Sequence, residues 1–75
     1  MIRNNDMGHF ENRMGQIMLD RGITVEHLSQ ETGKHRNTIA NMRKGTPTVR
    51  WDTLAAVANV MQVSPWALFV WVEND

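Results

Sequence analysis

Cysteine and tyrosine are both absent from this 75-residue sequence, and proline occurs only twice. Without cysteine the chain has no disulfide framework, no thiolate metal ligand and no thiol nucleophile. No apolar run approaches the roughly 20 residues that cross a bilayer, and the first residues lack the basic-then-apolar order of a signal sequence. We therefore expect a single small domain over residues 1–75, located in the cytoplasm and without a membrane partner.

Patterns for catalysis and metal binding are missing as well. The sequence has no paired carboxylates, no Ser-His-Asp grouping and no glycine loop that would hold phosphate, so we expect no enzyme, no catalytic residue, no cofactor and no small-molecule ligand. His27, Glu31 and His35 follow an i, i+4, i+8 spacing, but Gly33 interrupts it and no cysteine completes the set. A solvated helix face is the better interpretation, and no metal site is expected.

The formal net charge is zero, yet the basic residues are unevenly distributed. The segment between Gly33 and Trp51 contains no Asp or Glu, and its basic residues are Lys34, Arg36, Arg43, Lys44 and Arg50. A basic face on a neutral body can contact phosphates, although its long-range attraction is weak. We expect low affinity for non-specific polyanions.

Residues 24–45 predict two short helices joined by a tight turn. Thr24 is a suitable N-cap for the first helix, whose inward face is formed by Val25, Leu28 and Ser29. Gly33 suits the positive-φ position that ends this helix and turns the chain.

The second helix is expected over about residues 35–44, with Ile39 and Met42 inward and Gly45 at its end. Its outward residues are His35, Arg36, Asn37, Ala40, Asn41 and Lys44. Arg and Asn can form bidentate contacts with guanine and adenine, and a short helix can enter a major groove. This favours base reading by Arg36, Asn37 and Asn41, with Ala40 against a thymine methyl. The alternative is an ordinary solvated face.

The stretch Thr24–Gly45 resembles the helix-turn-helix of the Cro/CI-type (Xre-like) regulators, whose pattern is T-Q-x-x-L-A-x-x-x-G-V-S-x-x-T-I-S-x-x-x-x-G. The matching residues are Thr24, Leu28, Gly33, Thr38, Ile39 and Gly45. Residues 53–69 also resemble the fourth and fifth helices of that family. The sequence departs from the pattern at Val25, where Gln is frequent, and at Lys34-His35, which replace Val-Ser. Arg43 and Met18 occupy the positions of a frequent acid–arginine pair.

The resemblance implies an all-α, five-helix, lambda-repressor-like domain that acts as a sequence-specific transcriptional regulator, a small Cro-like repressor of bacterial or phage origin associated with the nucleoid. Double-stranded DNA with a palindromic operator would be its partner. Contacts with the DNA backbone are expected from Thr24, Lys34, His35, Thr38, Arg43, Lys44, Thr46, Thr48 and Arg50. For Thr46, simple turn formation is an equally good explanation.

The remaining segments predict further helices. A first helix is expected at about residues 7–21, with an inward stripe of Phe10, Met14, Ile17 and Met18. A fourth is expected at 51–61, with one face formed by Trp51, Leu54, Val57, Ala58 and Met61. Ser64 and Pro65 favour the start of a fifth helix that buries Leu68 and Phe69.

The last stretch contains more apolar side chains than a five-helix domain needs. Trp66, Val70, Trp71 and Val72 would form an unusual exposed patch on a monomer, so we expect them to form a homodimer interface. The fifth helix could continue to Glu73, or residues 69–73 could form a strand paired with Ile2–Asn4. We favour the strand, given its β-branched and aromatic residues.

A second function remains open. The apolar C-terminal segment and Val25 also fit a helix-turn-helix domain that binds proteins, such as an antitoxin or an anti-repressor.

Overall fold

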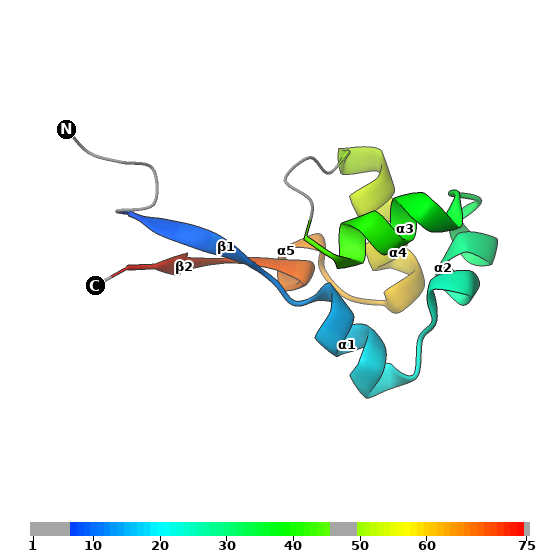
Figure 1. Cartoon of the computed structure of the whole chain (residues 1–75), viewed down its shortest axis with the longest axis horizontal. Helices are drawn as coiled ribbons and strands as arrows, with labels where there is room; N and C mark the ends of the chain where they lie inside the picture. The colour runs from blue at the N-terminus through cyan, green and yellow to red at the C-terminus, as the bar shows by residue number, and fades with distance from the viewer. Residues whose placement is uncertain (1–6, 46–49, 75) are drawn as a thin grey trace.

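The computed structural model describes residues 7–45 and 50–74. Within them lie five helices and two strands, which together form a helical body and a protruding antiparallel ribbon (Figure 1). In chain order the elements are β1 (Gly8–Asn12), α1 (Met14–Arg21), α2 (Val25–Thr32), α3 (Arg36–Arg43), α4 (Trp51–Met61), α5 (Pro65–Leu68) and β2 (Phe69–Glu73). The molecule measures 45 × 22 × 17 Å, because the ribbon extends beyond the helices.

One apolar core holds the five helices together. Each helix contributes at least one side chain that is almost fully buried, and examples are Met14, Leu28, Ile39, Val57 and Leu68, all with no measurable exposure. Such packing of amphipathic helices provides most of the stability of short helices. Of the predicted inward residues of the second, third and fourth helices, most occupy the core; Val25 is half-buried against it, Ser29 is half-buried outside it, and Trp51 is 67% exposed.

The local signals at the helix ends are confirmed. The hydroxyl of Thr24 accepts a hydrogen bond from the backbone N–H of His27 at 3.0 Å, and so caps α2. Gly33 ends that helix in the left-handed conformation with φ of 72°. Ser64 caps α5 by accepting from the N–H of Trp66, and Pro65 is its first residue.

The predicted first helix over residues 7–21 is wrong in its first half. Residues 8–12 form strand β1, and α1 begins only at Met14. Asn12 marks the change, because its side-chain oxygen accepts from the N–H of Met14 at 3.0 Å and replaces a helical partner. Phe10, expected in the core, is 67% exposed on the ribbon, where its ring meets that of Trp71 edge-to-face at 5.1 Å.

The strand predicted at residues 69–73 is confirmed as β2, but its partner is β1. The pairing runs from Gly8 opposite Glu73 to Asn12 opposite Phe69. The suggested partner, Ile2–Asn4, lies outside the described residues. The ribbon also means that "all-α" is too narrow a description of the fold.

Gly8→Ala is expected to open the ribbon. Gly8 has φ of +150°, and a Cβ there would collide with the carbonyl oxygen of Val72 and lie 2.8 Å from the Trp71 ring. The strain should cost about 1–3 kcal/mol locally. Amide hydrogen exchange should become faster in residues 8–12 and 69–73 and stay unchanged in α2.

Gly15→Ala is the matched control. A Cβ at Gly15 would meet the side chain of Arg43 at 3.5 Å, an ordinary contact. If Gly15→Ala accelerated exchange in the ribbon as much as Gly8→Ala, the conformational requirement at Gly8 would be refuted.

Candidate nucleic-acid interface

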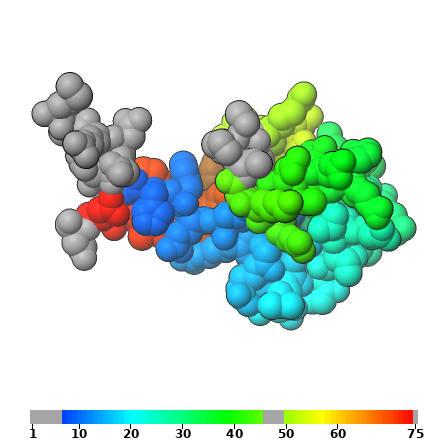
Figure 2. Space-filling model, in the orientation of Figure 1, coloured from blue at the N-terminus to red at the C-terminus, as the bar shows by residue number. Residues whose placement is uncertain are grey.

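No other described part of the chain covers the outer side of α3. Figure 2 shows this helix at the surface of the helical body. Its exposed residues are Arg36, Asn37, Thr38, Asn41 and Arg43, with His35 before the helix and Lys44 after it, while Ala40 is half-buried. On the opposite side, Ile39 is fully buried and Met42 is 3% exposed. The helix therefore presents a polar, basic face and is anchored by its apolar face.

Both ends of α3 are fixed by side chains. His35 is the N-cap residue, and its Nδ1 accepts from the backbone N–H of Asn37 at 3.0 Å. At the other end, the amide nitrogen of Asn12 donates to the carbonyl oxygens of Met42 at 2.9 Å and Arg43 at 3.1 Å. These contacts satisfy groups that a helix terminus leaves without helical partners.

Asn12 is a positioning residue that sequence reasoning missed. One side-chain amide joins the end of β1, the start of α1 and the end of α3. An Asn whose side chain accepts from the N–H two residues on is a recognisable local turn signal, here just before α1. Its contact with α3, however, spans 30 residues and has no local signature.

Arg36 forms an ion pair with Glu26, the second residue of α2. Its Nη2 lies 2.6 Å from Oε1 of Glu26, and both side chains are exposed. The two line a groove together with Ser29, Gln30 and His35. The predicted base-reading arginine is thus already held by an acid from the neighbouring helix.

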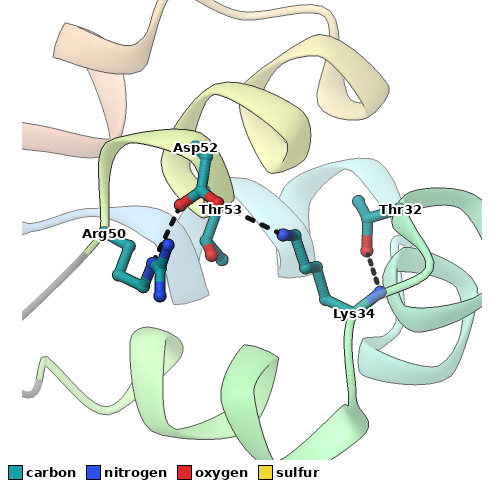
Figure 3. A network of polar contacts seen from close by, with 5 residues as sticks. All are labelled: Thr32, Lys34, Arg50, Asp52 and Thr53. Carbon is teal, nitrogen blue, oxygen red and sulfur yellow. Dashed lines mark hydrogen bonds and ion pairs between the residues drawn. The ribbon is translucent and has the colours of Figure 1, made fainter.

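A second acid, Asp52, lies between two of the predicted backbone-binding residues (Figure 3). Its carboxylate is 3.6 Å from Nζ of Lys34 and 3.2 Å from Nε of Arg50. It also accepts from the N–H of Thr53 at 2.9 Å. This bond, together with the charges of Arg50 and Lys34, lowers the pKa of Asp52 below its usual value of 3.8.

The sign of this shift sets its effect on stability. A carboxyl whose folded pKa is lowered stabilises the fold above its ordinary pKa, and the contribution is lost as the pH falls through the lowered value. At neutral pH Asp52 is therefore charged and partly neutralises Lys34 and Arg50. Because Asp52 and Arg50 are exposed to water and Lys34 is only half-buried, solvent screening keeps the energy small.

Arg43 and Lys44 differ from the other basic residues of this surface. Within residues 7–45 and 50–74, neither forms an ion pair. Arg43 passes its aliphatic stem close to Gly15 of α1, which leaves its charge at the exposed end of α3. These two cations are the ones most available to an anionic partner.

The other predicted backbone contacts are only partly described. Thr38 is exposed on α3, and the hydroxyl of Thr24 is used to cap α2. Thr46 and Thr48 lie outside the described residues. Sequence reasoning missed Glu26 and Asp52, because Glu26 contacts Arg36 and Asp52 contacts Lys34 across 10 or more residues of sequence, although Asp52 also pairs with the nearby Arg50. The available signal was Asp52, the first acid after the basic segment, whereas nothing in the spacing distinguished Glu26 from Glu31.

The predicted dimer interface is divided between two places. Trp66 packs edge-to-face against Trp51 at 5.5 Å, and each is 67% exposed. Trp71 lies on the ribbon against Phe10, with the half-buried Val70 and Val72 on the same strand. The structure therefore has two separate exposed aromatic pairs.

The described residues contain neither a metal-ligand cluster nor a membrane-spanning helix. Among them, no three His, Asp or Glu side chains come together as metal ligands would. No helix of this part of the chain has the length and apolarity to span a membrane.

Comparison with known proteins agrees with this geometry. The family model for the Cro/C1-type HTH DNA-binding domain matches residues 13–74. The chain is also similar to the crystal structure of a Bacteroides fragilis protein provisionally described as DNA-binding, with a TM-score of 0.70 and 26% identity, over 81% of this chain and 98% of that one. No curated protein matches the sequence. Because the family model spans most of the sequence, this chain belongs to the Cro/C1-type helix-turn-helix DNA-binding domains.

Proposed function

We propose that this protein is a small Cro-like transcriptional regulator that binds double-stranded DNA sequence-specifically, with α3 in the major groove. The observation that supports it best is the two-sided character of α3. Its apolar side is buried through Ile39 and Met42, and its outer side exposes Arg36, Asn37 and Asn41. Arg and Asn are the side chains that pair bidentately with guanine and adenine.

The remaining polar residues near α3 would fix the register on the duplex. Phosphate contacts come most often from basic side chains, hydroxyls and backbone N–H groups. Ala40 would contact a thymine methyl group. The proposed backbone contacts are Thr24, Lys34, His35, Thr38, Arg43, Lys44, Thr46, Thr48 and Arg50.

The operator would be palindromic and the protein a homodimer. Two copies related by a two-fold axis would read half-sites about one helical turn, roughly 34 Å, apart. In this proposal the protein is a lambda-repressor-like repressor, one domain over residues 1–75, acting in the cytoplasm on bacterial or phage DNA.

Selection of bound duplexes from a random DNA pool tests the function directly. We expect enrichment of one motif, repeated in inverted orientation at the spacing of one turn. The motif should disappear when the selection is repeated with a variant of Arg36 and Asn37 together. A flat pool, even at low salt, would contradict the proposed function.

The ribbon is the part of the proposed dimer interface that would gain most stability from packing against a second copy of the chain. A two-stranded ribbon is marginally stable by itself in water, and this one exposes Phe10 and Trp71. Trp71→Ser is therefore expected to shift the protein from dimer to monomer in sedimentation equilibrium.

Trp66→Ser is the matched control for that prediction. Trp66 belongs to the separate pair with Trp51, so this variant should remain dimeric. Dimers that persist in Trp71→Ser, or that are lost in Trp66→Ser alone, would contradict the role of the ribbon.

A protein-binding module, such as an antitoxin or an anti-repressor, is the second candidate function. The observation that favours it is the presence of two separate exposed aromatic pairs, because a dimer contact through the ribbon would leave Trp51 and Trp66 uncovered. A partner that co-purifies from the native host at fixed stoichiometry and is released by Trp66→Ser would support this function.

A further inference from the structure

Glu26 is an acid placed where a DNA-binding surface would be expected to avoid one. It lies in the first turn of α2, and its Oε1 is 2.6 Å from Nη2 of Arg36, the first residue of α3. The side chain of Glu26 is 66% exposed and that of Arg36 is 58% exposed. The pair is therefore at the open surface that α3 presents, and water or a ligand can reach it.

The pair leaves Arg36 able to read a base. A guanidinium group has five N–H donors, and the bond to Glu26 uses one of its two terminal nitrogens. Contact with the O6 and N7 atoms of guanine needs two parallel donors. Arg36 can thus keep its bond to Glu26 while its remaining donors face a base edge.

The pair also limits where Arg36 can go. To reach a phosphate away from the groove, the guanidinium would have to leave Glu26 and lose a charge-assisted hydrogen bond. In a chain of zero net charge, each free cation on this face is a large part of the attraction to any polyanion. A tethered arginine would contribute little to binding that ignores sequence.

We propose that Glu26 is a specificity-determining residue, which holds Arg36 toward the base edges and withholds it from phosphates. The inference rests on the proposed function, because it concerns how the same surface separates one DNA sequence from another. In this proposal the negative charge of Glu26, which by itself would only repel DNA, improves discrimination between DNA sequences.

The test compares two duplexes of equal length. One is the duplex enriched by the wild-type protein from a random pool, and the other is a scrambled sequence of the same composition. Affinities are measured by fluorescence anisotropy for the full chain and for Glu26→Gln, across a series of salt concentrations. Because Glu31 is exposed on the same helix and forms no ion pair within the described residues, Glu31→Gln is the matched control for the change in charge.

We expect Glu26→Gln to bind the scrambled duplex about 1.5- to fivefold more tightly than Glu31→Gln does, the range expected for releasing an exposed ion pair. Its salt slope on that duplex should become more negative by about 0.9, which corresponds to one added phosphate contact. Affinity for the selected duplex should stay the same or fall, so the ratio of the two affinities decreases. Thermal unfolding should be unchanged in both variants, since the pair is exposed.

Two outcomes would overturn the inference alone. The first is that Glu26→Gln and Glu31→Gln change both affinities by the same factor. The second is that Glu26→Gln still tightens binding in an Arg36→Gln background, because Glu26 would then repel phosphates directly and not act through Arg36. If the wild-type chain prefers no duplex at all, the proposed function fails, and the inference falls with it.

Discussion

Leu28→Ala is expected to lower the free energy of unfolding by about 2–5 kcal/mol. Leu28 has no measurable exposure and lies at the centre of α2, so its removal leaves a cavity beneath the helix-turn-helix. A domain of this size has a total stability of only about 4–11 kcal/mol, and so the variant should lose a large share of it and unfold at a much lower urea concentration. Urea denaturation followed by circular dichroism measures the change.

Leu19→Ala is the natural comparison, because it removes the same atoms from a side chain that is 78% exposed on α1. Its effect should stay within about 0.5 kcal/mol of the wild-type value. Equal destabilisation by the two variants would mean that the core described above is misplaced.

Arg36→Ala is expected to cost about 1–3 kcal/mol in affinity for the selected duplex and to relax the sequence preference at one position of each half-site. The substitution removes the donors that would contact a base, and it leaves the carboxylate of Glu26 without its partner. Binding to scrambled DNA should change much less. A competition assay against a panel of single-base variants of the selected duplex would measure both effects.

Lys44→Ala is the contrasting variant for Arg36→Ala. Lys44 is exposed after the end of α3 and forms no ion pair within the described residues, so it can contribute charge without base recognition. Its loss should weaken binding to all sequences alike and reduce the salt slope by about 0.9. A uniform loss for Arg36→Ala as well would remove the case for base reading by Arg36.

The helix-turn-helix was predictable because its signals are local. Thr24 and Gly33 each act on backbone groups within a few residues, and the spacing of Leu28, Ile39 and Met42 alone separates the inner faces from the outer ones. The same reasoning failed at residues 7–13. There Phe10 and Met14 match a helical stripe, but the positive φ of Gly8 and the pairing with β2 decide the structure.

For the candidate site, the sequence predicted which face of α3 is exposed, but not the side-chain contacts made there. Periodicity correctly separated the exposed residues of α3 from the buried ones, except that Ala40, expected outward, is half-buried. It could not reveal that Glu26 and Asp52 neutralise neighbouring cations, or that Asn12 supports the end of α3, because these contacts join residues from different elements. Side-chain pairing across a turn depends on how the helices pack against each other. The spacing of residues along one helix does not predict that packing.

The ribbon joins the two ends of the described chain, and this has a consequence for the order in which the protein assembles during synthesis. Residues 8–12 leave the ribosome before the helices do, but their pairing partner, residues 69–73, is made only after all five described helices. The helices α1 to α4 can pack together before β2 is made. Until then, the backbone N–H and C=O groups of β1 stay hydrogen-bonded to water. Pairing of segments so far apart in sequence costs more chain entropy than a local contact does, and it therefore forms slowly. The nascent protein therefore forms α3 before it forms the ribbon.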